Sequence, residues 1–451
     1  MRDRPVEERI KDFDEVDRGL SLEEAMAEAE RCLQCKKPMC VSGCPIGIDI
    51  PEFVRAVAEG EIDEAARIIE AANMLPAICG RVCPQEVQCE GECVLGRKEA
   101  PLAIGQLERF VADEMRRKAR PVPKCKPPTG KSVAVIGSGP AGIVAASELA
   151  RAGHHVTIFE SLHEPGGVLM YGIPSFRLPK EIVREEVSRV LALGVDLRLN
   201  HLAGRSVTLE ELRQFDAVFI ATGAGLPRFL GIDGENLCGV YSANEFLTRV
   251  NLMHADRFPE YDTPVKRGAR VAVIGGGNVA MDAARVSIRL GSKVYLIYRR
   301  REEDLPARKA EIERAREEGV EFITCANPVR IIGDEWVNGI ECVRMEMCEL
   351  DKSGRPVPRT IEGSRFMLDV DAVIVAIGQG PNPLFAGMIP DLRRGKEGTI
   401  EVDGDGQSSV PKFFAAGDIT TGAATVILAM GAAKKAAASL DRMLSGDEAT
   451  A

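Results

Sequence analysis

Cysteine is the residue type whose spacing in this sequence most clearly indicates chemistry. Thirteen cysteines are present, and eight of them fall in two short runs near the N-terminus. The runs are Cys32-x2-Cys35-x4-Cys40-x3-Cys44 and Cys79-x3-Cys83-x5-Cys89-x3-Cys93. Thiolates at such short separations can surround one metal centre. A proline follows both Cys44 and Cys83, as in bacterial ferredoxins, where the last cysteine of a run ligates the other cluster. The two runs therefore predict metal-bound thiolates.

Zinc and iron–sulfur clusters are the two metal centres that these runs could hold. Closely spaced cysteine pairs also build zinc sites, so spacing alone leaves zinc open. The spacing is not the Cys-x2-Cys repeat of zinc ribbons, however, and the nucleotide-binding motifs downstream require an acceptor for single electrons. The sequence therefore favours iron–sulfur clusters over zinc.

A glycine-rich turn follows the apolar strand predicted over residues 132–136 and opens a helix. Its pattern is Gly137-x-Gly139-x-x-Gly142. The first glycine permits the tight turn, the second lets the backbone approach a pyrophosphate, and the third lets the helix pack against the strand. The helix N-terminus adds NH groups and positive dipole. The residues of this turn that we predict to contact a dinucleotide are Gly137, Gly139, Pro140, Ala141 and Gly142.

A second copy of the motif begins at residue 270, in register with the first. The strand over residues 271–274 leads into Gly275-x-Gly277-x-x-Ala280, then a helix to residue 290 and a strand over residues 294–298. Two such strand–turn–helix–strand units are typical of a pair of nucleotide-binding domains. The residues of this turn that we predict to contact a second nucleotide are Gly275, Gly277, Asn278, Val279 and Ala280.

The residue that closes the second strand distinguishes the two copies. In the first copy it is Glu160, an acid placed to bind the hydroxyl pair of a ribose. The same offset in the second copy falls on Tyr298, which Arg299 and Arg300 follow. An aromatic ring and guanidinium groups suit a 2′-phosphate. The first copy thus predicts FAD and the second NADPH, whereas the alternative for the arginines is a solvated charge run.

Further segments repeat the ends of nucleotide-domain strands. Residues 216–223 and 371–378 are apolar runs that end in small residues, and residues 412–418 end in Gly-Asp. Residues 164–179 are rich in glycine and proline, so we expect an irregular loop whose backbone approaches a flat ring. A long helix is expected over residues 423–444, and its N-terminal dipole could stabilise negative charge on a flavin. The cofactor-contacting residues predicted here are Gly167, Thr222, Gly223, Gly417, Asp418, Thr425 and Val426.

Composition limits the class of protein and its surroundings. The chain has 451 residues, 45% hydrophobic content and a net charge of -10, which is typical of a soluble globular protein of several domains and gives no reason to expect nucleic acid as a partner. The N-terminal residues lack the apolar stretch of a signal or membrane anchor. We therefore expect a cytoplasmic location and no membrane partner. In the cytoplasm thiols stay reduced.

The two nucleotide motifs, the paired cysteine runs and the Gly417-Asp418 turn together resemble the glutamate synthase small-subunit family over essentially the whole chain. This family includes the NADPH-binding subunit of NADH-dependent reduced ferredoxin:NADP⁺ oxidoreductase, and its module recurs in dihydropyrimidine dehydrogenase. The resemblance implies an α/β protein with an N-terminal all-α iron–sulfur domain, followed by two Rossmann-like domains with the NADPH domain inserted in the FAD domain. The expected ranges are 1–125, which ends at a proline-rich linker over residues 121–130, then 126–252 with 380–451 for FAD, and 253–379 for NADPH.

The same resemblance implies two [4Fe-4S] clusters and their ligands. One cluster would be held by Cys32, Cys35, Cys40 and Cys93. The other would be held by Cys44, Cys83 and Cys89, with a fourth ligand on the following helix at Glu108. Cys79 would then be a non-ligand, although spacing alone includes it.

Three functions remain to be compared, two enzymatic functions with different partners and one that is not enzymatic. In the first, the chain exchanges electrons between NADPH and ferredoxin, with a second flavoprotein subunit as partner and FAD bifurcating the electron pair. In the second, it passes NADPH electrons to a glutamate synthase large subunit. In the third, it is a non-catalytic scaffold that binds zinc and nucleotides. Hydride and electron transfer need no acid or base, so no catalytic side chain is predicted, and both enzyme functions imply a hetero-oligomer.

Metal analysis separates the third function from the other two. We expect protein purified without oxygen to contain about eight irons, the content of two four-iron clusters, and one FAD. The measurement is iron, zinc and flavin content per chain. Zinc in place of iron would contradict the electron-transfer functions.

Overall fold

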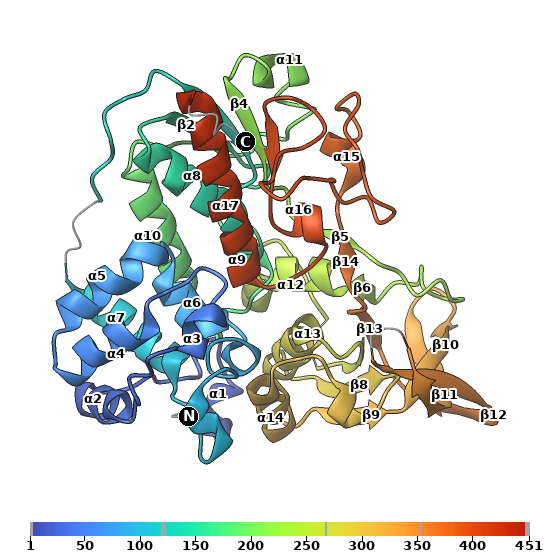
Figure 1. Ribbon diagram of the computed structural model, residues 1–451. Helices are drawn as coiled ribbons and strands as arrows, with labels where there is room; N and C mark the ends of the chain where they lie inside the picture. Colours follow the sequence, from blue (N-terminus) through green and yellow to red (C-terminus); the bar gives the residue numbers. More distant parts are fainter. Residues whose placement is uncertain (1–2, 119–122, 267, 352–353, 447–451) are drawn as a thin grey trace.

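The computed structural model describes residues 3–118, 123–266, 268–351 and 354–446, so the predicted linker over residues 121–130 lies partly outside the described residues. Figure 1 shows three parts in chain order: a group of N-terminal helices, a first sheet flanked by helices, and a second sheet unit that extends into a long hairpin. None of the helices in the described ranges is both long and apolar enough to cross a membrane.

The N-terminal part is helical, and amphipathic patterning explains its helices. Ser21 caps α2 in a capping box with Glu24. On α4, the side chains of Phe53, Val54 and Val57 are completely buried on one face. The helices of this part are α1 (Val6–Arg9), α2 (Leu22–Glu30), α3 (Met39–Ser42), α4 (Ile50–Ala58), α5 (Ile62–Ala72), α6 (Pro76–Val82), η1 (Gln85–Val87), η2 (Val94–Arg97) and α7 (Ile104–Arg117).

The first parallel sheet has five strands among the described residues, in the order β15-β4-β1-β2-β3. These strands are short and apolar, as expected for strands covered on both faces. Its strands are β1 (Ser132–Ile136), β2 (His155–Phe159), β3 (Asp196–Arg198), β4 (Ala217–Ile220) and β15 (Phe413–Ala415). Its helices are α8 (Pro140–Arg151), α9 (Val168–Tyr171), α10 (Lys180–Leu191), α11 (Leu209–Leu212), α15 (Pro383–Ala386), α16 (Asp418–Thr421) and α17 (Val426–Ser445).

The second parallel sheet repeats the first, with the described strands in the order β6-β13-β7-β8-β9. Its strands are β6 (Val240–Ser242), β7 (Arg270–Ile274), β8 (Lys293–Tyr298), β9 (Glu321–Thr324) and β13 (Ala372–Val375). Its helices are α12 (Ala243–Asn251), η3 (Ala255–Arg257), α13 (Asn278–Arg289), η4 (Glu302–Asp304) and α14 (Lys309–Glu317). All these strands lie in the sequence between β4 and β15, so the second sheet is inserted in the first, as predicted. Strand β6 belongs to the second sheet although it precedes residue 253.

The matching register of the two sheets places both glycine turns at the same kind of edge. Strand β1 pairs with β2 from Ser132↔His155 to Ile136↔Phe159, and β7 pairs with β8 in the same parallel arrangement. The turn after β1 and the turn after β7 therefore both lie at the carboxyl ends of parallel strands, where open α/β sheets bind ligands. The predicted α/β class with two Rossmann-like sheets is confirmed.

Two features of the fold differ from the expectations. An antiparallel sheet of β10 (Ala326–Gly333), β11 (Val337–Leu350) and β12 (Pro356–Leu368) extends from the second sheet unit, and nothing in our reading of the sequence predicted it. The loop expected over residues 164–179 contains the short helix α9, so the expectation of irregular structure throughout was wrong. Gly167 precedes this helix as its N-cap, and apolar Leu169 and Met170 bury one side of it.

Strands β5 (Leu226–Pro227) and β14 (Gln379–Gly380) form a small additional pair.

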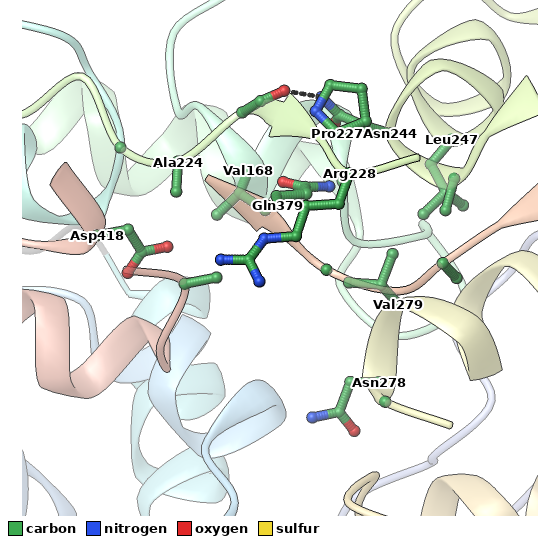
Figure 2. Close-up of a pocket in the computed structure, with 18 of the residues that line it drawn as sticks. Val168, Ala224, Pro227, Arg228, Asn244, Leu247, Asn278, Val279, Gln379 and Asp418 are labelled. Carbon is green, nitrogen blue, oxygen red and sulfur yellow. Dashed lines mark hydrogen bonds between the residues drawn. The ribbon is translucent and has the colours of Figure 1, made fainter. Parts of the chain in front are cut away.

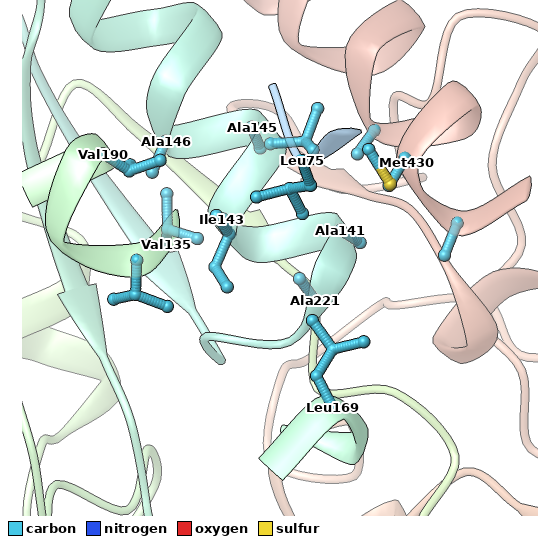
Figure 3. Close-up of a cluster of buried hydrophobic side chains, with 14 of the residues drawn as sticks. Leu75, Val135, Ala141, Ile143, Ala145, Ala146, Leu169, Val190, Ala221 and Met430 are labelled. Atoms are coloured by element: carbon cyan, nitrogen blue, oxygen red, sulfur yellow. The ribbon is translucent and has the colours of Figure 1, made fainter. Parts of the chain in front are cut away.

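One hydrophobic core joins the N-terminal helices to the first sheet unit. Figure 3 shows Leu75, which precedes α6, beside Ala141 and Ala145 of α8 and near Met430 of α17. Helix α17 packs along α8, and α6 contacts both α10 and α17. Burial of these apolar side chains therefore fixes the segment that carries the second cysteine run against the first sheet unit.

A buried ion network joins three segments that are far apart in sequence. Arg177 donates from Nη1 to both carboxylate oxygens of Asp282 on α13, at 2.8 and 2.7 Å. Arg285 of α13 donates to Glu318 at 2.8 and 2.9 Å, and Arg9 donates to the same carboxylate at 2.9 Å. Glu311 pairs with both Arg177 and Arg285 and so connects these two groups. We refer to Arg9, Arg177, Asp282, Arg285, Glu311 and Glu318 as the interdomain ion network.

Gly142 and Gly139 provide a contrast within one turn. A Cβ on Gly142 would lie 1.9 Å from the backbone oxygen of Gly137, whereas a Cβ on Gly139 would meet no atom within 4 Å. We expect Gly142→Ala to lower stability by about 1 to 3 kcal/mol through overpacking. Gly139→Ala should stay within about 0.5 kcal/mol of the parent.

Thermal unfolding of the nucleotide-free proteins, followed by circular dichroism, measures both effects without a contribution from bound ligand. Equal melting temperatures for the two variants would contradict the packing role of Gly142.

Candidate functional site

A cavity of about 1350 Å³ lies at the carboxyl ends of both parallel sheets. Both glycine turns, the ends of β2 and β8, and the turns after β4, β13 and β15 line it. In Figure 2, Asp418 and Val168 lie on one side of the space and Asn278 and Val279 on the other. One cavity thus joins the two predicted nucleotide sites.

Most of the predicted nucleotide-contacting residues line this cavity. They are Gly137, Gly139, Pro140, Ala141, Glu160, Gly167, Thr222, Gly223, Gly275, Gly277, Asn278, Val279, Arg299, Arg300, Asp418, Thr425 and Val426. Gly142, Gly417 and Ala280 are not part of the lining. Gly142 instead packs against Gly137, and Ala280 is completely buried in the core of the second sheet unit. Gly417 adopts φ 82°, which favours glycine, and precedes Asp418.

The first turn has the shape of a pyrophosphate cradle. Gly139 is the N-cap of α8, and Pro140 stands at the first helical position, where its missing NH is not needed. Because a side chain at Gly139 would meet only open space, the glycine leaves the cavity free at the helix N-terminus. Unpaired NH groups and the helix dipole make such a place suitable for an anion.

Glu160 is held rigidly at the end of β2. Its Oε2 accepts hydrogen bonds from the NH and the hydroxyl of Ser138, at 3.0 and 2.5 Å, and its Oε1 accepts one from the NH of Leu162 at 2.8 Å. Only 5% of the residue is exposed. Ser138 occupies a variable position of the glycine motif, so the sequence analysis did not predict its part in orienting the acid.

The second turn has the same geometry with different surroundings. A Cβ on Gly277 would also meet no atom within 4 Å, and α13 begins at Asn278. Tyr298, at the place equivalent to Glu160, donates its hydroxyl hydrogen to the backbone oxygen of Asp304 at 2.8 Å. Its ring packs close to Gly276, where an added Cβ would lie 2.7 Å from the ring.

Arginines gather at the edge of the cavity beyond Tyr298. Arg299 is exposed there, and its side chain makes no hydrogen bond or ion pair with the described residues. Arg300 is mostly buried and donates from Nε to the backbone oxygen of Pro356 at 2.8 Å. Arg355, which precedes Pro356 in the hairpin of β11 and β12, also lines the cavity. Arg301 instead pairs with Asp304 at 3.1 Å and is not part of the lining.

The wall on the side of the first sheet combines acids, a tyrosine and a helix start. Burial, followed by the charges of Glu160 and Asp418, raises the pKa of Tyr171 to about 12. Burial also raises the pKa of Asp418, whose carboxylate accepts a hydrogen bond from the NH of Ala424 at 3.2 Å. Thr425 caps α17 by accepting a hydrogen bond from the NH of Leu428 at 3.3 Å. Tyr171 was missed because its segment was read as a loop.

Arg228 is a further cationic side chain of the cavity that the sequence analysis missed. It extends into the space between Asp418 and Val279 in Figure 2. Its Nη2 donates to the carboxylate of Glu397 at 2.5 Å. No motif surrounds this arginine in the sequence, so only the folded chain brings it to the cavity.

The charges that raise the pKa values of the cysteines divide them into two groups. Burial, followed by the charges of Cys93 and Cys32, raises the pKa of the Cys40 thiol to about 11. Burial raises the pKa of Cys32 as well, and the neighbouring Cys35 and Cys93 add to the increase. Cys32, Cys35, Cys40 and Cys93, which we call the first cysteine set, are thus electrostatic neighbours although Cys93 belongs to the second run.

The second set consists of Cys44, Cys83, Cys89 and Glu108. Burial raises the pKa of Cys44 and of Cys89, and the charge of Glu108 raises both further. The pKa of Cys83 is raised by a hydrogen bond with Cys79, by burial and by Glu108. Within the described ranges, no three His, Cys, Asp or Glu side chains are grouped as they would be around a single metal ion. The ligand roles of both sets stay predictions.

Glu108 is an acid in a place where acids are rarely found. Only 6% of it is exposed, and burial raises its pKa to about 8. Asn73 donates from its side-chain amide to Oε1 at 2.6 Å. Ionising a buried carboxylate requires compensation by a positive centre or by hydrogen-bond donors. A cluster ligand would gain that compensation, so the donor set of three thiols and Glu108 fits an iron–sulfur cluster.

One member of the second cysteine set lies beside the cavity. Val82 and Pro84, the neighbours of Cys83 in the chain, both line it. Cys83 and Cys89 are buried, whereas Cys44 and the four cysteines of the first set are half-buried. The segment around Cys83 therefore connects the second set to the cavity wall.

Family models match nearly the whole chain. Residues 9–120 match dihydropyrimidine dehydrogenase domain II, 4Fe-4S cluster. Residues 131–436 match pyridine nucleotide-disulphide oxidoreductase. The second match spans more than half of the chain, so the chain is an oxidoreductase of this family with a 4Fe-4S domain before it.

Three relatives show how the chain compares with characterised proteins. It is 38% identical over 446 residues to the glutamate synthase (NADPH) small chain of Escherichia coli (strain K12), covering 96% of this chain and 94% of the relative. It is 41% identical over 433 residues to the NADP(+)-dependent formate dehydrogenase subunit beta of Moorella thermoacetica, covering 90% of this chain and 60% of the relative. It is 36% identical over 443 residues to the NADPH-Fe(3+) oxidoreductase subunit beta of Geobacter sulfurreducens (strain DL-1 / KN400), covering 91% of this chain and 64% of the relative. The chain spans less than two thirds of the length of the last two.

Solved structures share the fold of the nucleotide-binding part. Mycobacterium tuberculosis FprA in complex with NADPH matches with a TM-score of 0.58 and 23% identity, covering 71% of this chain and 85% of FprA. Thioredoxin reductase of T. acidophilum matches with a TM-score of 0.52 and 22% identity, covering 71% of this chain and 100% of the reductase. At this identity the similarity establishes the fold alone.

The position of Glu108 generates a prediction about the second cysteine set. Glu108→Cys should keep the cluster and shift its potential, because ligand type is one determinant of potential. Glu108→Ala should make the cluster labile. The measurement is redox titration followed by electron paramagnetic resonance, together with iron content.

Glu114→Ala provides the matched control, since Glu114 lies on the same helix and pairs only with the exposed Arg117 among the described residues. Unchanged signals in both Glu108 variants would reject this ligand and return Cys79, the neighbour of Cys83, as the candidate.

Proposed function

The chain belongs to the glutamate synthase small-chain family, and we propose that it is an NADPH-dependent electron-transfer subunit that binds FAD at the Gly137 turn and NADPH at the Gly275 turn. One observation carries this proposal: both turns open into a single cavity, and Val82 and Pro84, the chain neighbours of Cys83, form part of its wall. Nucleotides bound at both turns would be brought together within the same enclosed space.

The residues at the first turn fit FAD. The open space at Gly139 admits the pyrophosphate, and Glu160, oriented by Ser138, is placed for the ribose hydroxyls. Asp418 and the start of α17 would contact the remainder of the cofactor. FAD, when bound, supplies the change between a two-electron hydride and single electrons. The protein's part is to hold the ring in the cavity and exclude water from it.

The residues at the second turn fit NADPH better than NADH. An acid at the end of β8 would repel a 2′-phosphate, and Tyr298 stands there instead. Arg299 is exposed at the cavity edge, and the Arg300 guanidinium is held in place by the backbone oxygen of Pro356. Guanidinium groups bind phosphate oxygens through two parallel hydrogen bonds.

We further propose two [4Fe-4S] clusters, one for each cysteine set, and a division of the chain at residues 1–125, 126–252 with 380–451, and 253–379. The charges of Cys93 and Cys32 act on Cys40, and those of Glu108 and Cys44 act on Cys89, which supports two groups of donors. The buried Cys83, whose chain neighbours line the cavity, supports an order in which the second set is next to the nucleotides and the half-buried first set is further along. Electrons would leave the chain through the first set.

The proposed partners are ferredoxin and a second flavoprotein or iron–sulfur subunit, in a hetero-oligomer. Relatives that bear the names small chain and subunit beta support assembly with another polypeptide. Among the residues that the structure describes, the nucleotide-binding part contains no Cys-x-x-Cys pair of the kind that disulfide reductases use. Electrons would therefore be transferred from this chain to another protein. The proposal includes bifurcation of the electron pair by FAD, and measurement of the flavin reduction potentials tests this part of it.

A glutamate synthase small subunit is the second candidate. The observation that favours it is the alignment with the Escherichia coli small chain, which covers 94% of that relative. The test that separates the candidates is anaerobic purification with co-purifying chains, followed by two assays with NADPH, one for reduction of ferredoxin and one for glutamate formed from glutamine and 2-oxoglutarate. Failure of NADPH to bleach the flavin would contradict both candidates.

Nucleotide choice tests the second turn directly. Replacing Arg299 and Arg300 with alanine should weaken NADPH much more than NADH, at about 1.5 to 3 kcal/mol per charged hydrogen bond, because only NADPH carries the 2′-phosphate. Dissociation constants for both nucleotides measure the effect. Arg301→Ala is the control, since Arg301 pairs with Glu303 and Asp304 outside the cavity lining. Equal losses for NADPH and NADH would show that these arginines support the fold instead.

A further inference from the structure

Residues 306–308 form part of the wall behind the second glycine turn. The NH of Ala307 donates to the backbone oxygen of Gly276 at 3.2 Å. The backbone NH of Arg308 donates to Oδ1 of Asn278, the first residue of α13, at 3.0 Å. Pro306 lines the cavity itself. The position of this segment is therefore tied to the turn at which we propose that the nucleotide binds.

The Arg308 side chain reaches in the other direction, to the segment that carries Cys83. Its Nη1 donates to the backbone oxygen of Arg81 at 3.3 Å, and its Nη2 donates to Oε1 of Gln85 at 2.8 Å. Its Nε lies 3.3 Å from both carboxylate oxygens of Glu86. Helix α6 ends at Val82 with Cys83 as its C-cap, so Arg308 satisfies a carbonyl in the last turn of that helix.

Gln85 extends this contact into the core. It is only 4% exposed, and its Nε2 donates to the backbone oxygens of Cys79 at 3.3 Å and Gly80 at 3.4 Å. The amide packs closely against Gly105, where an added Cβ would lie 2.3 Å from Nε2. The Arg308 guanidinium is thus connected to the end of α6 through a buried, hydrogen-bonded side chain.

We propose that Arg308 is a positioning residue that couples nucleotide occupancy at the Gly275 turn to the cluster held by the second cysteine set. The inference rests on the proposed function, which assigns the nucleotide to Asn278 and the cluster to Cys83. A nucleotide that orders Asn278 orders the backbone at residues 307–308 and, through the guanidinium, the end of α6. Hydrogen bonding and charge around a cluster set its potential. Such coupling is reciprocal, so reduction of the protein must also change nucleotide affinity.

The test uses anaerobic holoenzyme and 2′-phospho-ADP-ribose, a probe that carries the pyrophosphate and 2′-phosphate but cannot be reduced. Calorimetry gives its affinity for oxidised and dithionite-reduced protein, and redox titration with electron paramagnetic resonance gives the cluster potential with and without the probe. In the parent protein we expect the two affinities to differ about 5-fold or more, the lower end of common coupling strengths. In Arg308→Ala the difference and the probe-induced shift of potential should disappear, while binding to oxidised protein is kept because the backbone NH to Asn278 remains.

Two further variants make the outcome decisive. Arg316→Ala, on helix α14, which Arg308 precedes as N-cap, should behave like the parent, because Arg316 pairs with the exposed Glu302. Arg308→Lys keeps the positive charge but lacks the several NH donors of the guanidinium. The difference in probe affinity between its oxidised and reduced forms should therefore be smaller than in the parent. If Arg308→Ala loses iron, Arg308→Lys provides the test of the coupling. Absence of any difference in the parent, or a full difference in Arg308→Ala or in Arg308→Lys, would overturn the coupling while leaving the proposed function in place. A parent protein that binds neither iron nor the probe would instead contradict the proposed function, and the coupling with it.

Discussion

The interdomain ion network is the interaction on which the arrangement of the three parts depends. Glu318 lies at its centre, where Arg9 from the N-terminal segment and Arg285 from α13 donate to one carboxylate. Burial opposes its ionisation, but Arg285 and Arg289 lower the pKa of Glu318 to about 2. Removing one member of such a pair leaves a buried charge without compensation, which typically costs about 3 to 5 kcal/mol. Buried ion pairs therefore hold the second sheet unit against the N-terminal segment, and removing either member of a pair would destabilise this contact.

The cavity is a consequence of that arrangement. Arg177, which follows α9 of the first unit, is bound to Asp282 on α13 of the second, and both residues line the cavity. The contact sets the two glycine turns opposite one another across a common space. The hydrophobic core around Leu75 and Met430 then places α6, with Cys83 at its end, behind the same wall. An ion network and an apolar core thus bring two nucleotide turns and one cysteine set to one place.

The local sequence pattern was enough to predict the strand–turn–helix units that bind nucleotides. The glycine turns, the strands that precede them and the difference between Glu160 and Tyr298 follow from backbone conformation and ligand charge, which short segments carry on their own. The hairpin of β11 and β12 was not predictable in this way, since its function depends on where it folds back. Arg355 and the backbone oxygen that holds Arg300 come from that hairpin. Ser138 and Tyr171 were missed because their roles depend on neighbours distant in the sequence.

The sequence by itself determined the strand–turn–helix units of an α/β protein, the two nucleotide turns and the two cysteine runs, because each depends on residue types at short, regular separations. The insertion of one sheet in the other followed instead from the resemblance to a known family. Only the tertiary structure decided that both turns open into one cavity, that Tyr171, Arg228 and Arg355 line it, and that the segment around Cys83 forms part of its wall. These are contacts between segments tens to hundreds of residues apart. They are formed by packing of apolar faces and pairing of buried charges, which select among many arrangements that the same local pattern permits.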